Sequence, residues 1–160
     1  CSSGPASVMV AVRKERWTYD ALLKRQAFTV GIASERMTAE ADFTGIASGR
    51  NGDKFEQAAL TPVRGELVDA PYANECPVIL ECRLLQHIEA GAHTMFVGQI
   101  LDVKCDEDCV TPGERGGSFP QFVPDIRKVA PLVFDSGSGG YFGVGERVGT
   151  AFSAGKVFLK

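Results

Sequence analysis

The sequence predicts a mixed fold that is mainly β, a barrel or sandwich of antiparallel strands decorated by short helices. Two long alternating segments, 77–90 and 93–105, flank a tight turn and supply the main evidence. A short valine-rich run near the N-terminus predicts a further strand, and several short segments have helical patterns. The 160 residues fit a single domain over residues 1–160, and neither an internal repeat nor an interdomain linker interrupts them.

The first part of the chain predicts strands and helices in alternation. Residues 6–13 are typical of a buried strand, and Thr18 is a plausible N-cap for a helix that ends at Arg25. A second strand is expected over 27–33, and a second helix over 38–48 with acids in its first turn. Asn51-Gly52 indicates a turn, after which Asp53 opens a short helix.

From Pro62 onward the apolar period changes from 3.6 to 2. In residues 77–90, one face carries Val78, Leu80, Cys82 and Leu84, and the other carries Glu81, Arg83, His87 and Glu89. With 93–105 this predicts a long antiparallel hairpin. Residues 105–124 show no apolar period and are expected to form an exposed loop. A short helix, a strand and a C-terminal helix are expected after it.

Composition limits the function classes. The net charge of −3 offers no general attraction for nucleic acid or for a membrane surface. No apolar run reaches the roughly 18 residues of a membrane span, and residues 1–20 lack the pattern of a signal peptide. Five irregularly spaced cysteines are interpreted as reduced thiols. A cytoplasmic protein is therefore expected.

Three motifs that suggest chemistry have simpler interpretations. The stretch "GVGERVG" (143–149) has the wrong spacing for a dinucleotide loop and no surrounding βαβ unit, so its glycines are assigned to a strand end and a tight helix entry. The stretch "CDEDC" (105–109) lacks a second ligand pair for zinc and is interpreted as a solvated loop. No nucleophile motif supports a hydrolase, and no metal site is predicted.

The stretch "RKERWT" (13–18) is a better candidate. Three cations and a hydroxyl follow a strand and stand at a helix start, where free N–H groups and the helix dipole favour a phosphate. A solvated basic rim explains the same residues equally well. Lys54 and His93 also have ordinary interpretations as exposed polar residues.

Four segments together resemble the flavin reductase-like family, whose members have an FMN-binding split barrel, and in particular its flavoredoxin-like members. They are "RKERWTYDALLKRQAFTVGIAS", "ADFTGIASGRNGDKFEQAALTPVRGELVDAPY", "CPVILECRLLQHIEAGAHTMFVGQILDVK" and "PDIRKVAPLVFDSGSGGYFGVGE". They follow the family's order over nearly the whole chain. The resemblance implies a mainly β fold, an antiparallel split β-barrel with short peripheral helices. The family's upstream segment, with an early barrel hairpin, has no counterpart before Cys1, so an incomplete or truncated chain is expected.

The resemblance also implies site residues. It places Thr18, Lys54 and His93 near the isoalloxazine ring, and Arg13 and Lys14 near the FMN phosphate. Further matches are Ser3, in a Ser-x-Pro turn, and Phe134, which corresponds to an aromatic residue near the ring; His87 is expected on the surface. Arg16 stands where the family has a small hydroxyl residue, and it either adds charge for the phosphate or crowds the pocket.

The function implied is that of an FMN-binding redox protein that passes electrons from a reduced nucleotide or protein donor to an acceptor. The family also implies a homodimer with FMN near the subunit interface. One alternative is an NAD(P)H:flavin oxidoreductase that uses flavin as a substrate and NAD(P)H as a transient donor. Another is a flavin-binding module without redox function.

Overall fold

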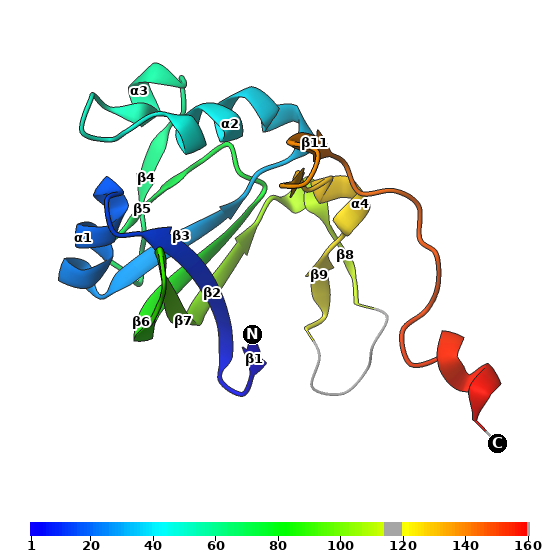
Figure 1. The fold of residues 1–160 in the computed structure, drawn as a ribbon. Coiled ribbons are helices and arrows are strands. Elements are labelled where there is room, and N and C mark those ends of the chain that lie inside the picture. Colours follow the sequence, from blue (N-terminus) through cyan, green and yellow to red (C-terminus); the bar gives the residue numbers. More distant parts are fainter. Residues whose placement is uncertain (114–119, 160) are drawn as a thin grey trace.

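A five-stranded antiparallel sheet forms the centre of the molecule (Figure 1). The computed structural model describes residues 1–113 and 120–159. The strand order is β1-β2-β7-β6-β3, and every neighbouring pair is antiparallel. The strands are β1 (Ser2–Ser3), β2 (Ala6–Arg13), β3 (Ala27–Ile32), β6 (Val78–Ala90) and β7 (His93–Cys105).

The β6–β7 hairpin confirms the strongest expectation from the sequence. Both strands have 13 residues, and their ladder runs from Val78 opposite Cys105 to Ala90 opposite His93. Gly91 closes the turn at a φ of 61°, a left-handed conformation that glycine adopts without strain. Strand β2 also has the expected bounds, but its residues are mostly half-buried or exposed. Only one of its faces packs on the core, because Val8, Val10 and Val12 contact the buried cluster and the residues between them are exposed.

Three two-stranded antiparallel sheets surround the central sheet. They pair β4 (Pro62–Arg64) with β5 (Pro71–Ala73), β8 (Val110–Pro112) with β9 (Phe122–Pro124), and β10 (Val133–Asp135) with β11 (Gly140–Phe142). The expected loop over 105–124 is therefore wrong for the described residues, because the β8 and β9 backbones pair in strands too short to show an apolar period. Residues 114–119 of that stretch lie outside the described residues.

The helices are short and lie around the sheet (Figure 1). Figure 1 shows α2 and α3 together on one side, and the chain after β11 running away from the sheet to its end. In place of the expected C-terminal helix, the structure has the short 3₁₀ helix η3. Glycine-rich residues precede it, and no other described part of the chain covers its apolar side chains. The helical elements are α1 (Trp17–Arg25), η1 (Glu35–Met37), α2 (Thr38–Ile46), α3 (Lys54–Gln57), η2 (Glu107–Cys109), α4 (Ile126–Val129) and η3 (Ala154–Phe158).

The core joins α1 to the sheet. Phe96 is fully buried at its centre, and the ring of Tyr19 from α1 meets the ring of Phe96 edge-on at 5.6 Å. Leu22 of α1 is buried in the same cluster. The main core therefore fixes the position of α1, and with it the position of the α1 N-terminus.

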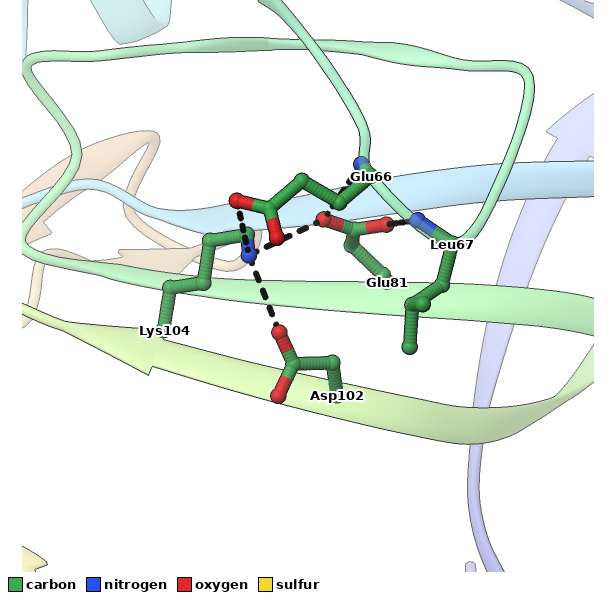
Figure 2. Close-up of polar contacts among 5 residues, drawn as sticks. All are labelled: Glu66, Leu67, Glu81, Asp102 and Lys104. Carbon is green, nitrogen blue, oxygen red and sulfur yellow. Dashed lines mark hydrogen bonds and ion pairs between the residues drawn. The ribbon is translucent and has the colours of Figure 1, made fainter.

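Glu81 departs from the expected alternation, because it is fully buried although the period of 77–90 predicts it on the polar face of β6. A register shift between Glu81 and Cys82 breaks the alternation, so that both side chains are buried. The Glu81 carboxylate accepts hydrogen bonds from the backbone N–H groups of Glu66 (3.1 Å) and Leu67 (2.7 Å), and pairs with Lys104 at 3.4 Å (Figure 2). Glu81 thus fastens the β4–β5 loop onto the sheet.

Candidate functional site

The N-terminus of α1 is the centre of the candidate site. After β2 ends at Arg13, the Arg16 N–H donates to the Arg13 carbonyl at 3.0 Å, and this turn leads directly into the helix. Arg16 is the N-cap residue, and no side chain accepts a hydrogen bond from the helix start. The expectation that Thr18 is the N-cap is wrong, because this turn starts the helix at Trp17. The first N–H groups of α1 therefore remain available to an anion.

The residues around this helix start carry positive charge. Arg13 lies opposite His93 in the β2–β7 ladder and pairs with Glu15 at 3.4 Å. Lys14 donates to Glu89 at 2.8 Å, and this hydrogen bond raises the pKa of Lys14. Arg16, by contrast, has no carboxylate within ion-pair distance among the described residues. Arg16 is therefore the cation best placed to take a phosphate.

Lys54 reaches the same region from α3. Asp53 caps this helix by accepting a hydrogen bond from the Phe55 N–H at 2.8 Å, which fixes the start of the helix and the position of Lys54. The Lys54 ammonium donates to the Thr44 carbonyl at 2.6 Å. Burial lowers the pKa of Lys54, and the positive charge of Arg16 lowers it further. The charge of Arg16 thus acts on Lys54, although the sequence separates the two residues by 38 positions.

The predicted residues thus lie in three places. Arg13, Lys14, Arg16, Thr18, Lys54 and His93 lie at or next to the α1 N-terminus, and we call them the basic cluster. Ser3 pairs with Ala6 at the opposite end of β2, on the order of 20 Å along the strand from Arg13. The Phe134 ring packs on Tyr141, whose hydroxyl donates to Asp42 of α2. The contacts of Phe134 therefore connect it with α2 rather than with the α1 N-terminus.

Sequence reasoning missed an aromatic surface beside the basic cluster. Trp17, the first residue of α1, keeps 55% of its surface exposed. Gly49 lies against it so closely that a Cβ there would be 3.1 Å from the Trp17 ring. The combination of Trp17 with the glycine of "SGRNGDKF" is the signal that could have indicated this contact. A half-exposed indole next to cations suits a planar ring that carries a phosphate.

Two further features bear on function. His87 is exposed as expected, with its ring 6.0 Å from that of Phe96. Within residues 1–113 and 120–159, no group of three or more His, Cys, Asp or Glu side chains is arranged to hold a metal ion. Over the same residues, no helix is both long enough and apolar enough to cross a membrane.

Comparison with known proteins supports the resemblance. A model of the flavin reductase like domain matches residues 1–138. The structure of flavoredoxin from Desulfovibrio vulgaris (Miyazaki F) is 46% identical, with a TM-score of 0.87 over 98% of this chain and 79% of that chain. An uncharacterised Archaeoglobus fulgidus protein is 31% identical over 78% of this chain, which spans 65% of that protein's length.

The architecture is shared more widely than the sequence. The structure of a putative flavin reductase with a split barrel domain, from Shewanella frigidimarina, has a TM-score of 0.78 over 96% of this chain and 74% of that chain, at 16% identity. At this identity the likeness shows the fold alone, and it confirms the expected split barrel. The match to the family model and the 46% identical structure go further: this chain belongs to the flavin reductase-like family.

Proposed function

We propose that this chain binds FMN and passes electrons between a reduced donor and an acceptor. The observation that carries the proposal is the α1 N-terminus without a side-chain cap, beside Arg16, which pairs with no carboxylate of residues 1–113 and 120–159. Helix N–H groups and a guanidinium together suit a terminal phosphate. The half-exposed Trp17 offers a surface for the ring, so the residues present fit FMN. The likeness to flavoredoxin supports the same choice.

The flavin ring, when bound, supplies the electron transfer, and the protein supplies position and electrostatics. Arg16 and the helix start would hold the phosphate. Lys54 and His93 would place a cation and a hydrogen-bond donor near the ring. Positive charge there stabilises the negative charge of reduced flavin, and so raises its reduction potential.

Replacing Arg16 by alanine is expected to weaken FMN binding by roughly tenfold or more, as the loss of a charged hydrogen bond predicts. The measurement is a titration of FMN followed by flavin absorbance and fluorescence. Lys24→Ala is the matched control, because Lys24 lies in the last turn of the same helix. Equal FMN dissociation constants for the native chain and Arg16→Ala would show that Arg16 does not bind the phosphate.

Kinetics separate the three functional classes. Stoichiometric bound FMN that a reduced donor reduces and an acceptor reoxidises supports the proposal. Fast NAD(P)H-dependent reduction of free flavin without tight binding would make the chain a flavin oxidoreductase that releases its product. Bound flavin that dithionite reduces, but that no donor or acceptor affects, would leave a binding module.

A homodimer in the cytoplasm forms part of the proposal. All five cysteines are free thiols, as suits a reducing compartment. The C-terminal segment, residues 143–159, leaves the sheet (Figure 1). It exposes large apolar side chains, with Val148 103% and Phe158 85% exposed. Exposed apolar segments of this kind mark contact with another chain.

Removing residues 143–160 is expected to convert the dimer to a monomer, because the apolar side chains of this segment would no longer cover the partner. Light scattering coupled to size-exclusion chromatography measures the mass directly. The double substitution Val157→Ser and Phe158→Ser should weaken the dimer without shortening the chain. A full-length chain that is monomeric at micromolar concentration would overturn the dimer.

A further inference from the structure

A cavity of about 360 Å³ lies between α2, α3, β3 and β5. This volume is at the lower end of the range for small-molecule sites, roughly 300–1,000 Å³. Its walls are mainly apolar, and include Met37, Phe55, Leu60 and Tyr72. The cavity is therefore suited to a molecule with a single aromatic ring.

Several polar groups of the wall already have partners. The Thr29 hydroxyl donates to the Pro71 carbonyl at 2.6 Å, and the Lys54 ammonium donates to the Thr44 carbonyl. Glu40 of α2 stands apart, because its Oε2 atom is shut off from solvent and accepts no hydrogen bond from the described residues. Rotation of a carboxylate about its last bond is soft, so this oxygen can turn toward a donor inside the cavity. An unpaired buried acceptor is costly, and a ligand that donates to it would remove that cost.

The charges of the wall select the kind of ligand. The wall carries one carboxylate, Glu40, and one ammonium, Lys54, so their charges offset each other and an ion of either sign gains no net attraction that would offset its loss of hydration. A neutral molecule with a hydroxyl group remains. We propose that this cavity binds a small, uncharged aromatic alcohol of the phenol type, whose hydroxyl donates to the Glu40 carboxylate.

This site is separate from the proposed phosphate site at the α1 N-terminus. The two have Lys54 in common, but Arg16, Trp17 and His93 do not line the cavity. The inference does not depend on FMN binding. It stands on the cavity, on the apolar wall and on the unpaired oxygen of Glu40.

The test compares phenol with its methyl ether, anisole, by isothermal titration calorimetry on the full chain, with and without added FMN. Anisole keeps the ring but has no donor. Phenol is expected to bind at least about tenfold more tightly than anisole, as a hydrogen bond to a charged acceptor predicts. In Glu40→Met, which removes the acceptor, the two affinities are expected to become equal.

Two variants separate ligand binding from folding. Glu56→Met removes an exposed carboxylate from α3 outside the cavity, and should keep the preference for phenol. Ala41→Leu fills the cavity from α2, and should abolish binding of both compounds while the circular dichroism spectrum stays native. Equal affinities in the native chain, no binding of either compound, or a preference that persists in Glu40→Met would overturn the proposal. Competition between phenol and FMN would also overturn it, because the cavity would then belong to the flavin site.

Discussion

Replacing Glu81 by alanine is expected to lower the free energy of unfolding by about 3–5 kcal/mol, the range found when one partner of a buried ion pair is removed. Glu81 is fully buried, and its carboxylate accepts hydrogen bonds from the backbone N–H groups of Glu66 and Leu67 (Figure 2). Alanine would leave both donors without an acceptor and would take one of three carboxylates from Lys104. Urea unfolding followed by circular dichroism measures the change.

Glu66→Ala is the matched control for this substitution. The Glu66 side chain pairs with the same Lys104 at 3.1 Å, but 75% of it is exposed. An exposed ion pair contributes at most about 1 kcal/mol, so this variant should be nearly as stable as the native chain. If both variants lost the same stability, the exposed ion pair rather than the buried carboxylate would hold the loop.

Acid provides a second measurement on Glu81. Burial raises its pKa, but hydrogen bonds from Leu67, Glu66 and Lys104 outweigh burial, and the pKa lies below the ordinary value of 4.5. A carboxyl whose pKa is lowered by folding stabilises the fold above the unfolded pKa, and this contribution is lost as the pH falls through the folded pKa. The stability difference between the native chain and Glu81→Gln should therefore be constant near neutral pH and shrink below pH 4.5.

Local sequence patterns predict the elements in which the apolar period continues over many residues. The 13-residue strands β6 and β7 show their period over many residues, and β2 ends where its valine run meets Arg13. The step from a strand to a helix singles out Arg13, Lys14 and Arg16, whereas Lys54 and His93 join them only through the family resemblance. The bounds of α2 differed from the expected 38–48 by two residues, since Ala47 leaves the helical conformation.

Features that depend on tertiary contacts could not be predicted. The burial of Glu81 follows from a strand bulge and from a loop some 15 residues away in sequence that supplies its donors. The effect of the Arg16 charge on Lys54 depends on how α3 packs, and no local pattern encodes it. The Trp17–Gly49 contact joins two segments in the same way. The place of Ser3, far along β2 from the basic cluster, becomes clear only from the strand register.

Replacing Phe96 by alanine is expected to cost about 3–5 kcal/mol of stability, as large-to-small changes of buried aromatic residues do. Phe96 is fully buried, and its ring holds Tyr19 of α1 against the sheet. The basic cluster lies at the N-terminus of the same helix. The loss of the Phe96–Tyr19 contact should therefore also weaken FMN binding under conditions where the variant is folded. Thermal unfolding and FMN titration measure the two effects separately.

Phe134→Ala is the control for this variant, because Phe134 is an aromatic residue with 58% of its surface exposed. The stability of Phe134→Ala should fall by at most about 1.5 kcal/mol, the upper value for a ring contact such as that with Tyr141. Weaker FMN binding in Phe134→Ala at nearly native stability would show that Phe134 contacts the flavin directly, as the family resemblance implies. Native FMN affinity in a folded Phe96→Ala would show instead that the α1 N-terminus does not depend on the core for its position, and the proposed link between the core and the phosphate site would fail.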